Sequence, residues 1–180
     1  MIKNIDFPKE KIESKRFFLR PITEDDVTLE YLDWLTEPTA KKYISASKNT
    51  ESLAQLKRYV RMRIGRPDVC FLGIFDKTTS RHIGNIKYEP VQVEKKYAVM
   101  GVLIGDAQWR GRGVFSEVFE ASAHWLYENK SITRFELGVD KTNISAIRSY
   151  EKAGFKPVDS QYINKSESSL TMGYDINLSP

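Results

Sequence analysis

The spacing of apolar positions changes several times along this 180-residue chain, and each change predicts a helix or a strand. Alternating or short continuous apolar runs predict strands at residues 16–20, 69–75, 83–89, 97–104, 132–139, 155–158 and 169–176. Apolar positions three and four apart predict helices at residues 23–37, 50–64, 114–128 and 143–152. Residues 1–15 are polar and mixed, which predicts a partly ordered lead-in.

The order of these elements predicts one mixed α/β domain that spans residues 1–180. A polar turn at residues 76–81 joins two strands into a hairpin, so the front half of the sheet is antiparallel. A single crossover at about residues 104–132 carries the long helix. We therefore expect a mostly antiparallel sheet of six to seven strands flanked by about four helices.

Composition narrows the class of protein. The net charge is +4, which is mildly basic, whereas a nucleic-acid-binding domain carries a denser basic stripe. Cys70 is the only cysteine, so an internal disulfide and a multi-cysteine zinc site are excluded. No apolar run approaches the ~20 residues that span a bilayer, and the first residues lack the apolar core of a signal peptide. We expect a cytoplasmic protein with no metal, nucleic-acid or membrane partner.

One glycine-bearing loop joins a predicted strand to the long helix. The strand ends at residue 104, and Gly111 and Gly113 remove side chains where the chain turns. A helix that begins after such a loop directs unpaired N–H groups and the positive end of its dipole at one spot, which suits a phosphate group. Arg110 and Arg112 add positive charge there.

Three phosphate-loop patterns can be compared with this loop. A P-loop needs Gly-x-x-x-x-Gly-Lys-Ser/Thr, which the chain lacks. A dinucleotide loop needs Gly-x-Gly-x-x-Gly, and Ser116 replaces its third glycine. The pattern Gln/Arg-x-x-Gly-x-Gly/Ala is met in full by Gln108, Gly111 and Gly113. An ordinary turn with two glycines remains the alternative.

A second informative string runs from residue 143 to 155. Asn143, Ala146, Ile147 and Tyr150 are spaced so that they share one face of a helix. Asn143 and Tyr150 are then roughly 10 Å apart along the helix, at ~1.5 Å per residue. Gly154 is placed to end that helix.

These two strings together resemble the acetyl-CoA-binding motifs of the GCN5-related N-acetyltransferases, the GNAT superfamily. The loop matches the family's Gln/Arg-x-x-Gly-x-Gly/Ala pattern, and the second string matches Asn…Ala-x-x-x-Tyr-x-x-x-Gly-Phe. Leu19-Arg20-Pro21 near the start is similar to the ribosomal-protein and spermidine acetyltransferase branches. The resemblance covers about residues 16–176.

The resemblance implies an enzyme that moves an acetyl group from acetyl-CoA directly to a primary amine. It implies that the strand before the loop splays from its neighbour, so that the pantetheine arm pairs with the open edge. Tyr150 would protonate the leaving thiolate. The implied cofactor-binding residues are Leu103, Ile104, Gly105, Gln108, Arg110, Gly111, Arg112, Gly113, Val114 and Asn143.

A general base is harder to place. Some relatives carry a glutamate on the strand before the loop, but Val99 and Met100 occupy the nearest positions here and cannot accept a proton. Glu89, at the end of the preceding strand, is the best carboxylate candidate. His82 is expected to be exposed in the hairpin turn, and His124 is expected to be a surface or packing residue. A water-mediated base and an amine that arrives neutral remain open.

The resemblance places the acceptor groove near the break between the first two helices, where Trp34, Glu37 and Tyr43 lie. The acceptor could be a protein N-terminal amine, a small amine or an amino sugar on a nucleotide carrier. Two other functions stay open: a GNAT-fold module that holds an acyl-CoA without turnover, and a nucleotide-dependent oxidoreductase. The sequence does not give the oligomeric state, so a homodimer is neither required nor excluded.

Overall fold

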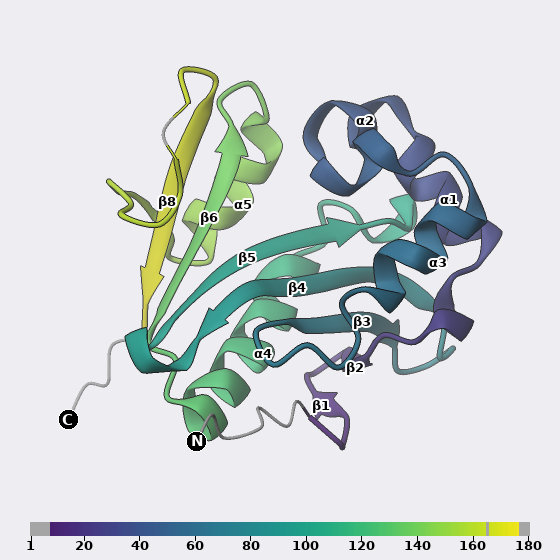
Figure 1. Cartoon of the computed structure of the whole chain (residues 1–180), viewed down its shortest axis with the longest axis horizontal. Coiled ribbons are helices and arrows are strands. Elements are labelled where there is room, and N and C mark those ends of the chain that lie inside the picture. Colours follow the sequence, from purple (N-terminus) through teal and green to yellow (C-terminus); the bar gives the residue numbers. More distant parts are fainter. Residues whose placement is uncertain (1–7, 165, 177–180) are drawn as a thin grey trace.

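The computed structural model describes residues 8–164 and 166–176. Residues 1–7, the first part of the predicted lead-in at residues 1–15, lie outside it. An eight-stranded sheet in the order β1-β2-β3-β4-β5-β6-β8-β7 forms its centre (Figure 1). The strands are β1 Ile12–Glu13, β2 Phe17–Pro21, β3 Cys70–Asp76, β4 His82–Gln92, β5 Tyr97–Ile104, β6 Arg134–Asp140, β7 Lys156–Pro157 and β8 Ser169–Asp175. The mixed, mostly antiparallel sheet is confirmed, with one more strand than the largest number expected.

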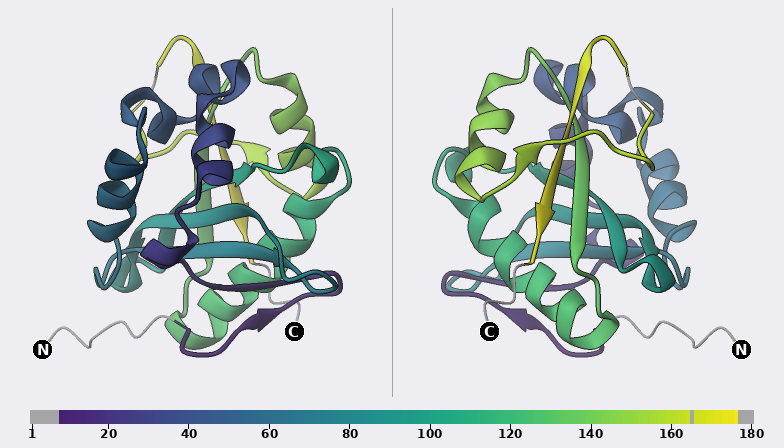
Figure 2. Two further views of the ribbon diagram at one scale, coloured as in Figure 1. Left: turned by 90° about the vertical axis from the view of Figure 1, so that its right-hand side faces the viewer. Right: turned by 90° about the vertical axis from the view of Figure 1, so that its left-hand side faces the viewer.

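Helices cover both faces of this sheet (Figure 2). The α-helices are α1 Leu29–Thr36, α2 Pro38–Tyr43, α3 Leu53–Arg61, α4 Val114–Lys130 and α5 Ile144–Lys152. α4 packs its apolar stripe on one face, together with α5. α1 and α3 enclose a second apolar cluster on the opposite face.

β5 and β6 are the pair that matters most for function. They are the only parallel pair among the described strands, and α4 makes the crossover between them. They pair only at residues 97–99 of β5, and then diverge, as Figure 1 shows. β6 continues alongside β8, while β5 continues alongside β4 to Ile104. The splayed strand expected from the family resemblance is therefore confirmed.

The predicted first helix is wrong in detail. Glu24–Asp26 form a separate 3-10 turn, and α1 starts only after Thr28, whose hydroxyl accepts a hydrogen bond from the Tyr31 amide. The chain does not continue as a loop after the predicted helix end at residue 37. Pro38 begins α2 instead, because a proline is well tolerated in the first turn of a helix. α3 ends at Arg61, three residues before the predicted end.

His82 also differs from its predicted exposed position. Its side chain is half-buried, stacked on Phe75 at 5.0 Å between ring centroids and packed edge-on against Trp34 at 5.1 Å. Burial lowers the pKa of His82 below its ordinary value. The folded protein therefore holds this imidazole neutral.

This burial predicts that stability depends on pH near neutrality. The unfolded chain binds a proton at His82 near pH ~6.5, whereas the folded chain does so only at lower pH. The free energy of unfolding should therefore fall as pH drops below about 6.5, and should level off below the folded pKa. Urea unfolding between pH 5 and 7.5 measures this slope. His82→Gln should flatten it, and an equal slope in both proteins would contradict the explanation.

Candidate active site

Two adjoining cavities lie where β5 and β6 diverge. The first has a volume of about 400 Å³ and lies over β4 and β5. The second has a volume of about 260 Å³ and lies between the end of β5, the following loop and α5. Six residues line both cavities: Tyr43, Ile44, Val102, Leu103, Asn143 and Tyr150. The two cavities are therefore neighbouring parts of one groove.

The open edge of β5 forms one side of this groove. Beyond Val99, β5 has no strand partner on its β6 side among the described residues. Backbone groups of residues 100–104 that point away from β4 are therefore available to an extended ligand, which could add to the sheet like another strand. Gly105 follows directly, and its amide donates to the Ile83 carbonyl. Its lack of a side chain is needed, because an added Cβ would lie 2.0 Å from the Trp34 ring.

The loop after β5 presents a row of backbone amides. Gly111 and Gly113 both adopt φ +72°, a conformation that glycine reaches without strain, and α4 begins at the next residue, Val114. Within the described chain, the amides of residues 111–116 have no hydrogen-bond acceptor, whereas the Arg110 amide donates to Ala107. An anion could bind these amides at the positive end of the helix.

The charged side chains of this loop have different positions. The Arg110 guanidinium donates to the carbonyls of Ile104 and Gly105, at 3.0 and 2.6 Å, and pairs with Glu37 at 2.9 Å. It therefore ties the α1–α2 junction to the end of β5. Arg112 is exposed. Gln108 is exposed too, and its backbone amide donates to the Asp106 carboxylate at 2.9 Å.

Tyr150 lies at the junction of the two cavities. Asn143 caps α5, accepting a hydrogen bond from the Ala146 amide at 3.3 Å, so both residues occupy the helix face that the spacing predicted. The Tyr150 ring stands edge-on to Phe115, with 4.9 Å between centroids. Its hydroxyl has no hydrogen-bond partner among the described residues, and burial raises its pKa to about 12. The phenol is therefore protonated at neutral pH and free to donate.

Glu89 lines the first cavity, but it is already paired. Its carboxylate accepts hydrogen bonds from Lys87 at 2.7 Å and from Arg63 and Arg66 at 2.8 Å each. Burial alone would raise the pKa of Glu89, but these cations outweigh burial and hold the pKa below its ordinary value. The geometry makes Glu89 a weak proton acceptor.

The three residues expected in the acceptor groove lie at different positions relative to the two cavities. Trp34 is only 5% exposed and lines neither cavity, so it supports Gly105 from below rather than facing the groove. Glu37 lines the second cavity and is engaged by Arg110. Tyr43 lines both cavities, and its hydroxyl lies 3.2 Å from that of Thr142 across the groove.

A family model described as the acetyltransferase (GNAT) domain matches residues 16–156. The chain belongs to the GNAT acetyltransferase family. The match covers most of the chain and includes the glycine loop, the open strand edge and Tyr150.

Three relatives of this GNAT acetyltransferase share less than a quarter of their aligned residues with it. An aminoglycoside N(6')-acetyltransferase type 1 from Klebsiella pneumoniae is 22% identical over 156 residues, covering 77% of this chain and 73% of the relative. A structure of the ribosomal L7/L12 α-N-protein acetyltransferase RimL in complex with coenzyme A is 17% identical, with a TM-score of 0.79 over 93% of this chain and 98% of that chain. A chimera of the spermidine N-acetyltransferase SpeG from Vibrio cholerae with hSSAT is 16% identical, with a TM-score of 0.73 over 89% of this chain and 96% of that chain. The structural likenesses support the fold.

The sequence interpretation singled out Glu89 but missed Asn85 and Lys87, the other polar residues on the floor of the first cavity. Asn85, Lys87 and Glu89 alternate with Ile86 and Tyr88 along β4. Ile86 and Tyr88 pack in the core beneath α4, so the three polar side chains face the cavity. This alternation was the available signal, but it shows only that one face of the strand is polar, not that a cavity lies above it.

Proposed function

We propose that the chain transfers the acetyl group of acetyl-CoA directly to a primary amine. One observation carries the proposal: the open edge of β5, the free amides of residues 111–116 and the unpartnered Tyr150 hydroxyl border a single groove. Acetyl-CoA would supply the thioester that makes the acetyl group reactive.

The residues present fit this co-substrate. The amides of Gly111 to Ser116 would hold the pyrophosphate, with Arg112 close by to add charge. The open edge of β5 around Leu103 and Ile104 would pair with the amides of the pantetheine arm, while Gly105, whose amide donates to Ile83, lets the chain pass close to Trp34 at the end of that edge. Asn143, which lines both cavities, is the polar side chain on the other wall. Arg110, whose amide and guanidinium are engaged, would hold the end of β5 in place.

Two parts of the chain would stabilise charge that develops during the transfer, one on the carbonyl oxygen and the other on the departing sulfur. Backbone N–H groups around Leu103 and Ile104 would stabilise the negative charge that develops on the carbonyl oxygen. Tyr150 would give its proton to the departing sulfur. The proton that the amine loses would restore the phenol, so no net proton is consumed.

The amine must lose a proton before it attacks. Glu89 was the carboxylate candidate, but its pairing with three cations makes it a hydrogen-bond acceptor rather than a base. We propose that the amine binds as its neutral fraction or loses its proton to water in the first cavity. An amine with a pKa near ~8, such as a protein α-amine, would have a substantial neutral fraction, unlike a lysine amine near ~10.4.

The relatives named above act on a ribosomal protein, on spermidine and on aminoglycosides, all of them amines. For this chain we propose a primary amine on a protein N-terminus or small molecule, with an amino sugar as the alternative. None of the described helices is both long and apolar enough to cross a membrane, and no described cluster of His, Cys, Asp and Glu could hold a metal. The cytoplasmic location, the single domain and a homodimer stay predictions.

Melting curves with acetyl-CoA, CoA, NAD and ATP at equal concentration test the proposal. A ligand at ~100 times its Kd stabilises the folded state by about 2.7 kcal/mol. At roughly 2–4 °C per kcal/mol for a protein of this size, the midpoint should rise by about 5–11 °C. We expect the rise with acetyl-CoA and CoA only, followed by thiol release with an amine. A rise with NAD alone, or with no ligand, would refute the transferase. Acetyl-CoA binding without transfer would favour a non-catalytic module.

A further inference from the structure

The charges around the groove oppose a polycationic acceptor. Three carboxylates line the two cavities: Glu37, Glu89 and Asp140. Six basic side chains pair with these carboxylates or lie close to them, and two of the six, Lys87 and Arg110, line the cavities themselves; the others are Lys42, Lys48, Arg63 and Arg66. Polyamines and aminoglycosides carry several ammonium groups and need unpaired carboxylates to bind them. In this groove no carboxylate is left without a partner in the described structure.

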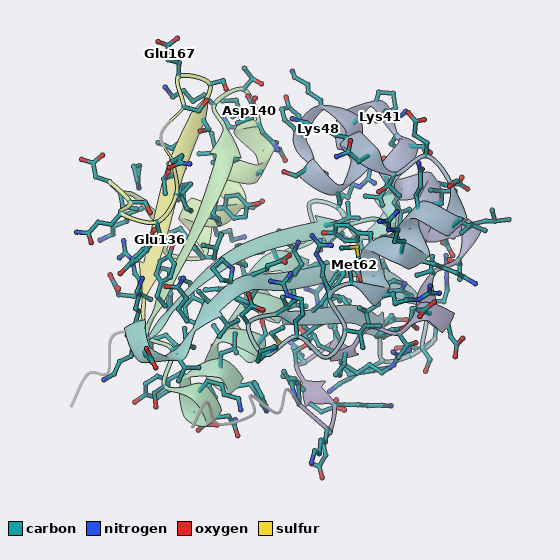
Figure 3. The ribbon with its side chains drawn as sticks, viewed as in Figure 1. Lys41, Lys48, Met62, Glu136, Asp140 and Glu167 are labelled. Carbon is teal, nitrogen blue, oxygen red and sulfur yellow. The ribbon has the colours of Figure 1, made fainter. Side chains whose placement is uncertain are left out.

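Each of the three carboxylates is already compensated. Glu89 and Glu37 form the ion pairs described above. Asp140 accepts hydrogen bonds from the amide and hydroxyl of Thr142, at 2.8 and 2.6 Å, and lies in the field of Lys42 and Lys48. Figure 3 shows Asp140 at the end of β6 and Lys48 on the opposite side of the gap.

Asn85 supplies a second, independent observation. Its side chain lines the first cavity and is only 4% exposed. The Oδ1 atom accepts a hydrogen bond from His82 Nε2 at 2.9 Å, and the packed His82 ring fixes the amide in place. The Nδ2 group, by contrast, is buried without any hydrogen-bond partner in the described structure. A buried donor left unpaired costs about 1–3 kcal/mol, so a ligand oxygen that accepts from it would bind favourably.

Lys87 lies two residues further along the same face of β4. Side chains two apart on a strand are ~6.6 Å apart at their Cα atoms, so one small group could reach both. The Lys87 ammonium donates to Tyr59 Oη at 2.8 Å and to Glu89 at 2.7 Å, which leaves one of its three donors for a ligand. Gly101, opposite Lys87 on β5, leaves open space beside it, since an added Cβ would meet no atom within 4 Å.

We propose that the acceptor carries an anionic oxygen group, a carboxylate or a phosphate, near its amine, and that Asn85 Nδ2 and Lys87 Nζ bind this group. The inference rests on the proposed function, because it assigns the first cavity to the amine substrate. The anionic group would anchor the acceptor on the floor of the cavity, below the junction where Tyr150 and the end of β5 lie. Asn85 and Lys87 would then set specificity without taking part in the chemistry.

Matched pairs of acceptors test the inference through thiol release from acetyl-CoA. The carboxylate pair is the peptide amide Asp-Ala-Ala against Asn-Ala-Ala, and the phosphate pair is glucosamine 1-phosphate against glucosamine. Spermidine and kanamycin serve as polycations. Hydrogen bonds to charged groups predict that kcat/KM favours the anionic member of at least one pair by roughly 10-fold or more. Which pair responds distinguishes an acidic N-terminus from a phosphorylated amino sugar.

Variants connect this preference to the two residues. Lys87→Gln removes the charge, and Asn85→Asp removes the donor while keeping an oxygen for His82. Each should reduce the preference about 10-fold or more, through a lower kcat/KM for the anionic member. Lys57→Gln, an exposed lysine of α3, is the charge-matched control and should leave the preference intact.

The outcomes separate this inference from the proposed function. If acetyl-CoA raises the melting temperature and polycations or neutral amines are acetylated in preference to anionic acceptors, the inference is overturned and the transferase stands. If acetyl-CoA binds but no acceptor is acetylated, the inference fails together with the transferase. A preference that survives both variants also overturns it. If no acetyl-CoA binding is seen, the proposed function itself has failed.

Discussion

Replacing Tyr150 by phenylalanine is expected to lower kcat about 100-fold or more at saturating acetyl-CoA, because the departing sulfur would lose its proton donor. The phenol lies at the junction of the two cavities, with no other hydrogen-bond partner in the described structure. Its ring packs on Phe115, and phenylalanine preserves that contact. The protein should therefore keep its fold.

Thiol release at saturating amine measures the effect of Tyr150→Phe. The acetyl-CoA-dependent rise in melting temperature should be retained, which separates a chemical defect from a loss of cofactor binding. Tyr127→Phe removes a phenol from α4, away from both cavities, and should leave kcat unchanged. An unchanged kcat in Tyr150→Phe would show that another group protonates the leaving sulfur.

Replacing Gly84 by alanine is expected to destabilise the fold by about 3 kcal/mol, because β4 and β5 would have to move apart. A Cβ at Gly84 would lie 2.3 Å from the Leu103 carbonyl oxygen and 3.1 Å from the Ile104 Cα. Both neighbours are backbone atoms, which cannot turn aside as a side chain can. Leu103 and Ile104 also form the open edge, so acetyl-CoA binding should weaken as well.

A thermal melt of Gly84→Ala should show a fall of about 6–12 °C for a protein of this size. Gly101→Ala is the matched control, because Gly101 lies in the same strand pair and an added Cβ meets no atom within 4 Å. Its stability should be unchanged or slightly higher, since alanine restricts the unfolded chain more than glycine does. Equal melting temperatures for the two variants would refute the steric argument.

Local patterns were sufficient for most of the fold. The alternating residues of β4, β6 and β8 bury one face against helices, whereas β3 is a continuous apolar run that is buried on both faces. Both patterns can be predicted from the sequence. β1 was missed because a two-residue strand has no period to detect. α2 was missed because Pro38 can end one helix or begin the next, and only packing decides between them.

The site could be predicted only where it depends on backbone geometry. Gly111 and Gly113 shape a loop, and Asn143 and Tyr150 share a helix face, so spacing alone places them. Glu89 was chosen for its carboxylate, but two of its three basic partners come from the segment after α3 and the third from β4 itself. Trp34 was expected in the groove, yet the path of the chain at Gly105 covers it. Such contacts join distant segments, which a single sequence does not reveal.

The way the sheet ends has a consequence for solubility. An unpaired strand edge invites strands of other chains, so exposed edges promote aggregation. Among the described strands, the two at the outer ends of the sheet, β1 and β7, are only two residues long. They therefore present few unpaired backbone groups to a strand of another molecule. The longer unpaired edge, that of β5, lies inside the groove between α2 and α5. A protein that needs an open edge for its ligand therefore keeps that edge recessed, out of reach of its own copies.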